Sequence, residues 1–318
     1  MKAISELLAR SESRVLVEAK LKPMQGSRFQ PTGFPDLGAA VFDSKEGQTL
    51  LVESAQSMAN RLEQTIWDGT TKDLIGAAKG LSYVRVNDDK GEYLTSTITE
   101  AHRLNSPYIL EAKDKSFFNE LKEKTDAFSK GVIDRAKLAS VVASYDINAL
   151  IHGVFLAKSE LAGGRLRIER ALSAFIEATG IRVAASGGVK NDPVNPSGEA
   201  KDGFGNVPFQ RDEYTADSIV AYFNLDLGQL RAYALGDAAT TLLTALALFK
   251  VRAFLDGGLR LRTACDLDVI EVQVRRPDGF KLPSKADFEA GLPPLVAAAS
   301  KLFGGKNGVT TVTFAEGK

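Results

Sequence analysis

The segment TLLVESAQSMANRLEQTIW, residues 49–67, carries the clearest periodic pattern in this chain of 318 residues. Its apolar side chains recur at helical spacing, at Leu51, Ala55, Met58, Leu62 and Ile66. The pattern predicts a helix over residues 49–67 that turns an apolar stripe towards the core. At about 100° per residue, the opposite face of this helix carries polar side chains. They are Gln56, Ser57 and Asn60, with Arg61 on the flank.

Segments on both sides of this helix alternate between apolar and polar residues, which is typical of strands with one covered face. Such strands are predicted at residues 15–21, 81–86, 92–98, 181–186, 219–227, 259–262, 270–275 and 309–314, and a buried strand at 149–157. Further helices are predicted within residues 113–143, at 168–178, at 237–255 and before the last strand. This order of elements indicates an α+β domain whose sheet carries long insertions.

Two connecting segments have an unusual composition. Residues 22–38, beginning at Lys22, contain three prolines, three glycines, Arg28, Phe29 and Phe34, a mixture that is odd for a solvated loop and indicates contact with a partner. Residues 187–212 are rich in glycine, proline and asparagine, which predicts a long irregular excursion that is either functional or disordered.

The charge balance and the cysteine content limit the functional class. Lysine plus arginine equals aspartate plus glutamate, 40 against 40, so no global positive field attracts nucleic acid or anionic lipid. Any RNA site must therefore be a local basic patch. The single cysteine, Cys265, excludes an internal disulfide and suits a cytoplasmic protein. Residues 1–10 lack the apolar core of a signal peptide, and the apolar stretch 238–249, shorter than the roughly 20 residues of a bilayer span, indicates a buried helix.

Motifs of several enzyme classes are absent from the sequence. It contains no G-x-G-x-x-G, G-x-x-x-x-G-K-[ST], H-E-x-x-H or G-x-S-x-G. The two histidines, His102 and His152, have no acidic or cysteine partner at ligand spacing, so no metal site is expected. His152 lies in an apolar segment and is expected to be hydrogen-bonded in the core. His102, beside Arg103, is as suited to a ligand contact as to a structural role.

Arginines and amides are the polar groups that remain, and they suit phosphate and ribose better than bond breaking. The arginines gather as Arg165, Arg167 and Arg170, as Arg260 and Arg262, and as Arg275 and Arg276. Each group is equally compatible with a salt-bridged or solvated surface. The short polar side chains of the helix at 49–67 admit a sugar-phosphate backbone closely and offer donors, although composition alone favours a plain solvated face.

At this helix the sequence resembles a known family. The string Leu51-Val-Glu-Ser-Ala-Gln-Ser-Met-Ala-Asn-Arg-Leu-Glu63 is similar to the type I-G (formerly I-U) branch of the Cascade backbone family of CRISPR effectors, within the RAMP superfamily. The resemblance covers most of the chain, through residues 28–38, 101–104, 151–155, 186–190, 205–209, 221–227 and 259–267.

The resemblance implies an RRM-like (ferredoxin-like) palm as a single domain over residues 1–318. Into it are inserted a helical or finger segment at 64–145 and a thumb-like loop at 187–214. The implied function is a non-catalytic subunit that polymerises along the guide CRISPR RNA (crRNA), holds its sugar-phosphate backbone and presents its bases for pairing with target DNA. The implied partners are crRNA, target DNA, further copies of the chain in a helical filament and other Cascade subunits, with no membrane and no cofactor.

The resemblance also implies a set of site residues. It maps Gln56, Ser57, Asn60 and Arg61 onto the helix that lies against the guide backbone in the superfamily. With the other candidates, the predicted RNA-binding residues are Lys22, Arg28, Phe29, Gln56, Ser57, Asn60, Arg61, His102, Arg103, Arg165, Arg167, Arg170, Lys190, Arg260 and Arg262. The implied apolar wedge of the thumb, which would fold over the RNA and displace a base, is Val207, Phe209 or Tyr214. Many relatives carry more lysine and arginine on the helix at 49–67, and this difference agrees with the neutral charge of the chain.

Two other functions are open alternatives. RAMP relatives in type III effectors cut target RNA with a loop aspartate, and Asp36 in the proline- and glycine-rich loop is the candidate for such a ribonuclease. The second alternative is a small-molecule enzyme on an α/β scaffold, which the missing motifs make the weaker of the two.

Overall fold

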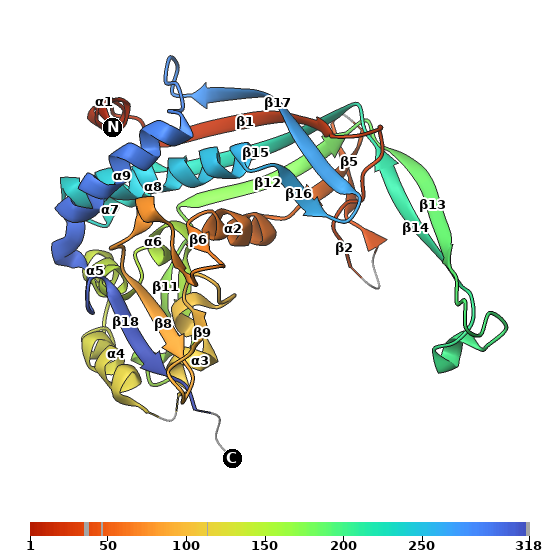
Figure 1. Ribbon diagram of the computed structural model, residues 1–318. Helices are drawn as coiled ribbons and strands as arrows, with labels where there is room; N and C mark the ends of the chain where they lie inside the picture. The colour runs from red at the N-terminus through yellow and green to blue at the C-terminus, as the bar shows by residue number, and fades with distance from the viewer. Residues whose placement is uncertain (35–37, 46, 113, 316–318) are drawn as a thin grey trace.

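The structure, a computed structural model, describes residues 1–34, 38–45, 47–112 and 114–315 (Figure 1). Within these residues, seven strands form one antiparallel sheet in the order β16-β17-β1-β15-β12-β5-β4. They are β1 (Arg14–Pro23), β4 (Val41–Ser44), β5 (Gly47–Glu53), β12 (Leu172–Thr179), β15 (Ser218–Asp226), β16 (Leu259–Arg262) and β17 (Cys265–Arg276). Together with the helices around it, this sheet confirms the predicted α+β class.

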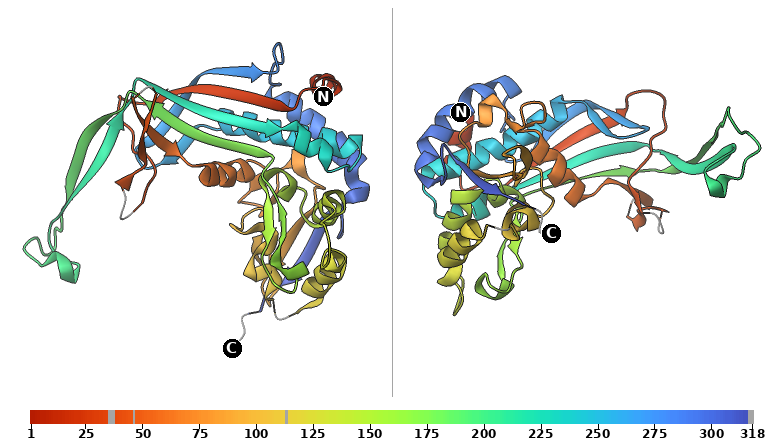
Figure 2. Two further views of the ribbon diagram at one scale, coloured as in Figure 1. Left: turned by 180° about the vertical axis from the view of Figure 1, so that it is seen from behind. Right: turned by 60° about the horizontal axis from the view of Figure 1, so that its bottom comes forward.

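Helices cover one face of this sheet (Figures 1 and 2). Along the chain the elements run β1, α2 (Ala55–Gln64), β12, β15, α8 (Asp237–Asp256) and β17, and the four strands lie in the order β17-β1-β15-β12. The strand β1 buries every second side chain, Val15, Val17, Ala19 and Leu21, as its alternating sequence predicts. Three further helices, α1 (Lys2–Ala9), α7 (Leu227–Ala232) and α9 (Lys285–Ala299), pack against α8.

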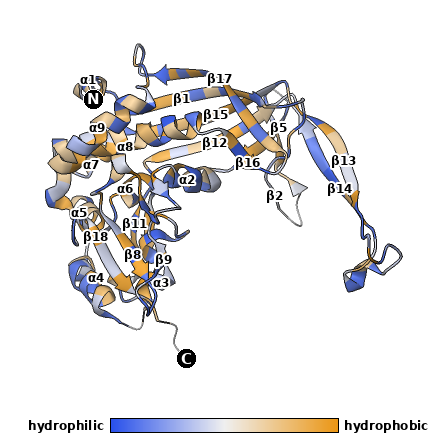
Figure 3. Ribbon diagram, viewed as in Figure 1, coloured by the Kyte–Doolittle hydropathy of each residue, from blue (hydrophilic) through white to orange (hydrophobic). Residues whose placement is uncertain are grey.

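The core helix α8 is apolar along almost its whole length (Figure 3). Among the described residues, α8 is the one helix that is long and apolar enough to cross a membrane. However, 72% of its most apolar stretch is buried inside the protein. Packing between the sheet and α9 explains its apolar surface, and the prediction of a buried helix around residues 238–249 is confirmed.

A small lobe, formed by residues 67–168 and 300–315, lies below the helix-covered face of the sheet in Figure 1. Its strands β8 (Tyr83–Asn87) and β9 (Tyr93–Ser96) form the predicted hairpin, and β18 (Val309–Thr313) pairs parallel with β8. The remaining elements are β6 (Trp67–Asp68), β7 (Asp73–Leu74), α3 (Pro107–Leu110), α4 (Ser116–Asp126), α5 (Arg135–Tyr145), α6 (Ala149–His152), β10 (Val154–Leu156) and β11 (Leu166–Ile168).

A two-stranded ribbon projects away from the rest of the molecule in every view (Figures 1 and 2). It consists of β13 (Arg182–Lys190) and β14 (Val207–Thr215), paired without a register shift from Arg182 opposite Thr215 to Lys190 opposite Val207. The prediction of an irregular segment over 187–212 is therefore wrong for its two ends, which are regular strands. The glycines permit this pairing, because a Cβ on Gly187 would lie 2.7 Å from the carbonyl oxygen of Phe209.

The predicted helix at 49–67 is too long, because residues 47–53 form the strand β5. The helix α2 begins only after Ser54, whose hydroxyl accepts a hydrogen bond from the Ser57 backbone N–H, as an N-cap residue does. Leu51 fits the helical stripe by its spacing alone. Leu50 and Val52 are both fully buried in the strand, which pairs with β12 and β4.

Two other predicted elements are wrong in type. Residues 168–178 form no helix: they end β11 and enter β12, whose buried residues alternate strictly as Leu172, Ala174, Ile176 and Ala178. Residues 149–157 begin with the short helix α6 and become the strand β10 only after Gly153, which has φ 81°. In both places a short apolar run fits the period of a helix as well as that of a strand, and the tertiary pairing decides which of the two forms.

Candidate nucleic-acid interface

The first two turns of α2 present the polar face that the sequence predicts. Gln56 and Asn60 are exposed, and the Gln56 amide donates a hydrogen bond to Oδ1 of Asn60 at 3.1 Å. Ser57 is only half-exposed, and its hydroxyl donates to the buried carboxylate of Glu53. The helix therefore offers two exposed amides, while its serine is committed to the protein.

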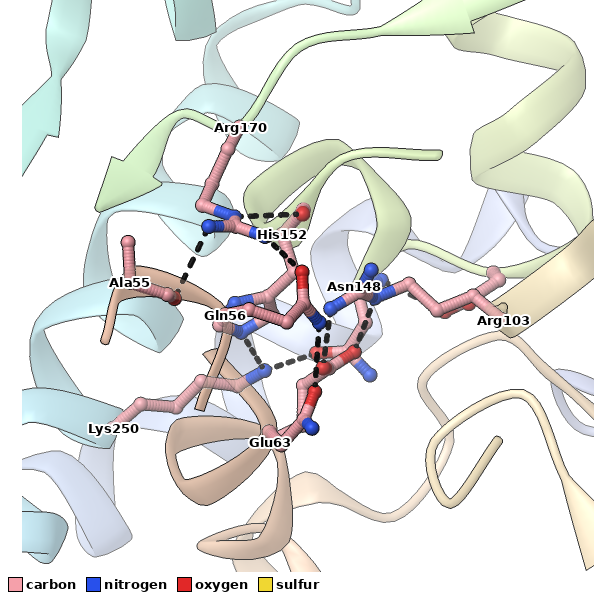
Figure 4. Close-up of polar contacts among 10 residues, drawn as sticks. Ala55, Gln56, Glu63, Arg103, Asn148, His152, Arg170 and Lys250 are labelled. Carbon is pink, nitrogen blue, oxygen red and sulfur yellow. Dashed lines mark hydrogen bonds and ion pairs between the residues drawn. The ribbon is translucent and has the colours of Figure 1, made fainter. Parts of the chain in front are cut away.

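Arg170 is held against the beginning of α2 by three neutral oxygens (Figure 4). Its guanidinium donates to the Ala55 carbonyl at 3.1 Å, to Oε1 of Gln56 at 2.8 Å and to the His152 carbonyl at 3.3 Å. No carboxylate of the described residues pairs with it. Burial, and the nearby charge of Arg103, lower the pKa of Arg170 below its ordinary value. A cation that has no ion pair among the described residues and is fixed beside exposed amides and a helix N-terminus suits an anion.

Arg103, predicted to bind RNA, lies in the core beneath this surface. Its side chain is 7% exposed and makes a bidentate pair with Glu63 of α2, with Nε–Oε1 and Nη2–Oε2 distances of 2.7 and 2.6 Å. The guanidinium is therefore neutralised inside the protein, where it joins α2 to the small lobe (Figure 4).

The same buried region contains Lys250 of α8, together with Asp146, Asn148 and His152. The Lys250 ammonium group contacts Oδ1 of Asn148 and lies 2.9 Å from Nε2 of His152. Burial lowers the pKa of Lys250 to about 7, raises that of Asp146 to about 7 and holds that of His152 well below its ordinary value. The predicted core role of His152 is confirmed.

Two further predicted RNA-binding residues, Arg61 and Arg262, share one buried carboxylate. Nε of Arg61 lies 3.2 Å from Oε1 of Glu53, and Arg262 pairs with the other oxygen of that carboxylate. Arg61 also donates to the Leu261 carbonyl, and Arg262 to the Gln30 carbonyl at 3.1 Å. These bonds hold α2, β16 and the loop after β1 together, and the two guanidiniums and one carboxylate leave one net positive charge.

The predicted loop residues lie at the root of the projecting ribbon. Arg28 is exposed and pairs with Glu213 at 3.3 Å. Phe29 is 1% exposed and Tyr214 is 7% exposed, and their backbones exchange two hydrogen bonds of 2.9 Å. Phe29 was predicted to contact RNA and Tyr214 to be a wedge residue. Both side chains are instead buried and close the core at this point.

Val207 and Phe209, the other two predicted wedge residues, lie on the ribbon and are 38% and 52% exposed. The Phe209 ring lies across Gly188, where a Cβ would come within 3.1 Å of it. Lys190 is exposed on the same ribbon. The ribbon therefore carries an exposed apolar surface away from the core.

The remaining predicted residues lie on the surface. Lys22, His102, Arg165, Arg167 and Arg260 are all exposed. Arg260 lies 3.8 Å from Asp266, and Arg165 donates to the Phe128 carbonyl. Asp36, the candidate ribonuclease residue, lies outside the described residues. In the ranges that the structure describes, no three His, Cys, Asp or Glu side chains are grouped to hold a metal ion.

The structure adds partners that the sequence patterns did not indicate. Glu53 pairs with two predicted RNA-binding arginines and Glu63 with a third, and Lys250 lies buried in a helix whose sequence is largely apolar. The exposed Phe155 lies opposite Arg167 in the β10–β11 pair. No sequence pattern singles out Phe155, because residues 154–156 are all apolar and only their burial in the folded chain alternates.

Comparisons with known proteins point to one family. The family model described as CRISPR-associated protein GSU0053 matches residues 15–183, and no curated protein matches the chain. One similar solved chain belongs to a "CRISPR RNA-guided surveillance complex, pre-nicking", with 16% identity, a TM-score of 0.44, and coverage of 87% of this chain and 80% of that one. Another is Csc2 of Thermofilum pendens, with 10% identity, a TM-score of 0.34, and coverage of 91% and 76%. Because the family match spans more than half of the chain, the protein belongs to the CRISPR-associated protein GSU0053 family.

Proposed function

We propose that this protein is a non-catalytic backbone subunit of a type I-G (formerly I-U) CRISPR effector of the Cascade kind. It polymerises along crRNA in the cytoplasm, holds the sugar-phosphate backbone and leaves the bases free to pair with target DNA. Its partners are further copies of itself and other Cascade subunits. The observation that supports this most strongly is Arg170, a cation without a counter-ion that is fixed by neutral oxygens beside the exposed amides of α2.

The chemistry at α2 fits a ribose-phosphate chain. Gln56 and Asn60 offer amide groups to hydroxyl and phosphate oxygens, and Arg170 offers charge at the same place. Contacts of these groups to ribose and phosphate carry no base information, which suits a protein that accepts guides of any sequence. The balanced total charge agrees with a local phosphate site, and it disfavours a general affinity for nucleic acid.

The topology supports an RRM-like palm. The succession β1, α2, β12, β15, α8, β17, with the strand order β17-β1-β15-β12, is the β-α-β-β-α-β arrangement of ferredoxin-like folds. In this proposal α2 is the helix after the first palm strand, the finger insertion lies within residues 64–145, and the thumb at 187–214 corresponds to most of the projecting ribbon. Val207 and Phe209 then form its apolar wedge.

The proposal is tested by expressing the chain with its CRISPR array and purifying the assembly. Guide-length RNA should copurify, and sequencing it should return the spacers of the array. A preparation free of RNA, with the ultraviolet absorbance ratio of protein alone, would contradict the proposal.

The same preparation separates a backbone subunit from a ribonuclease. Complementary RNA incubated with the assembly and a divalent metal ion should stay intact. Periodic cuts that disappear in an Asp36→Ala variant would replace the proposed function with a RAMP-type endoribonuclease.

A further inference from the structure

A short strand pair of the small lobe places an aromatic ring and a guanidinium next to each other on the surface. In the antiparallel pair β10–β11, Phe155 lies directly opposite Arg167. Their neighbours Val154, Leu156, Leu166 and Ile168 are buried, so both strands turn only these two side chains outward. Phe155 is 51% exposed, and Arg167 is exposed with no partner among the described residues. Opposite residues of such a pair have Cβ atoms about 4.5–5.5 Å apart, close enough for one ligand to touch both.

These two residues border a hollow of about 390 Å³ that also reaches Arg170. Its remaining lining residues are Arg103, His152, Gly153, Val154 and Ile168, and none of the lining residues is a carboxylate. Gly153 permits the close approach of the chain segments here. A Cβ at this position would lie 3.0 Å from the Ile168 carbonyl oxygen and 3.1 Å from the backbone nitrogen of Arg170. The hollow is therefore a built feature of the junction between β10 and the segment that leads into β12.

The charge in this hollow is positive and uncompensated. Arg103 is neutralised by Glu63, but Arg170 is held only by neutral oxygens and Arg167 extends from the strand pair without a partner. The nearest residue in sequence that could compensate them, Glu169, pairs instead with Arg135 at 3.3 Å. His152 borders the hollow as well, with its ring buried, and the Nδ1 of this ring has no hydrogen-bond partner in the described part of the chain.

We infer that this hollow binds one nucleotide of the guide RNA that is withdrawn from pairing, with the phosphate on Arg167 and Arg170 and the base against the ring of Phe155. Two cations without ion-pair partners favour an anion, and an exposed aromatic ring beside them favours a flat apolar group. A nucleotide combines both. Arg170 also contacts α2, so the hollow continues the amide surface of α2 that the proposed function uses, and the inference rests on that function.

Two variants at one position test the contact between base and ring. Phe155→Leu keeps an apolar side chain but removes the ring, and Phe155→Tyr retains the ring. Because Phe155 is half-exposed, both variants should fold, and their thermal unfolding should match that of the parent protein. The probes are a guide-length oligoadenylate and an abasic ribose-phosphate oligomer of the same length, with affinities measured by fluorescence anisotropy.

Phe155→Leu should weaken binding of the oligoadenylate by about 5-fold or more, as the loss of one base stack predicts, and leave the abasic oligomer unchanged. Phe155→Tyr should bind both as the parent protein does. Arg167→Ala should weaken both probes, because the phosphate is common to them. Equal affinities of the Leu and Tyr variants for oligoadenylate would overturn the inference while leaving the proposed function intact, whereas no RNA binding by any variant would overturn the proposed function itself.

A competition with adenosine monophosphate separates RNA from a free nucleotide as the occupant. If the nucleotide of the guide RNA occupies the hollow, millimolar adenosine monophosphate should displace little of the bound oligoadenylate. Tight binding of adenosine monophosphate that is lost in Arg167→Ala, together with RNA affinity that does not change in Phe155→Leu, would assign the hollow to a free nucleotide and refute the inference.

Discussion

Glu63 of α2 and Arg103 of the small lobe face each other in a buried bidentate ion pair, with two N–O distances of 2.7 and 2.6 Å. Their side chains are 4% and 7% exposed, so water screens neither charge. Figure 4 shows the two residues of this pair together with Arg170 and Gln56. The pair therefore links α2 to the small lobe next to the proposed RNA surface.

Glu63→Gln should destabilise the folded protein by about 3–5 kcal/mol, because it leaves the Arg103 charge buried without a partner. Urea unfolding followed by circular dichroism measures the change. The matched control is Lys20→Ala, which removes the exposed 2.8 Å pair with Glu271 and should leave the unfolding midpoint unchanged. Similar unfolding midpoints for Glu63→Gln and the parent protein would show that the buried pair does not stabilise the fold.

Asp146 should make stability depend on pH in an unusual direction. Between its ordinary pKa of 3.8 and its folded pKa of about 7, the folded protein holds one proton more than the unfolded chain. The contribution of Asp146 to the free energy of unfolding is therefore greatest below this window and is lost as the pH rises through it. Asp146→Asn lacks this contribution, so its free energy of unfolding relative to the parent protein should rise from pH 4.5 to pH 6.5. Parallel pH profiles of the two proteins would argue against a protonated Asp146.

Removing the carboxylate of Glu53 should cost more than removing one of its partners. Glu53→Ala leaves the guanidiniums of Arg61 and Arg262 side by side without a counter-ion, and should cost about 3–5 kcal/mol. Arg61→Ala leaves Glu53 paired with Arg262 and should cost about 1–2 kcal/mol. Chemical denaturation of the two variants measures this difference. The reverse order would mean that Arg61 stabilises the protein by another contact.

Arg170→Ala should weaken RNA binding equally for guides of different sequence, because a phosphate contact carries no base information. The slope of log affinity against log salt should decrease by about 0.7, the value for one contact with single-stranded RNA. Arg10→Ala is the matched control, since Arg10 also donates to a backbone carbonyl, that of Asp278 at 3.1 Å, but follows α1 far from α2 (Figure 1). Loss of binding for some guide sequences only would indicate direct reading of bases.

Elements whose apolar pattern fits only the helical period or only the strand period were predicted correctly. The alternation in β1 and β15 and the long apolar run of α8 each allow one interpretation, and the structure confirms them. The wrong predictions at 49–54 and 168–178 fall where apolar residues fit both a helix and a strand. Ser54 was the local signal for the true start of α2, since serine is a preferred N-cap residue.

Arginine positions in the sequence did not reveal which of these side chains keep an uncompensated charge. Arg61, Arg103 and Arg262 are all paired with buried carboxylates, whereas Arg167 and Arg170 have no acidic partner among the described residues. Two of the acidic partners lie far away in the chain, 40 residues from Arg103 and 209 residues from Arg262, and Glu53 lies 8 residues from Arg61, outside helical spacing. Spacing along the sequence cannot report such pairs, because Coulomb energy depends on distance in space.

The order of residues alone determined the α+β class, the apolar core helix and the strings that resemble the Cascade backbone family, because periodicity and local motifs are properties of neighbouring residues. Tertiary structure alone decided that Phe155 faces Arg167, that Arg170 meets Ala55 and Gln56, and that Tyr214 is buried. Each of these relationships joins segments that only the folded chain brings together, and burial removes the water that would otherwise screen or satisfy the charged groups.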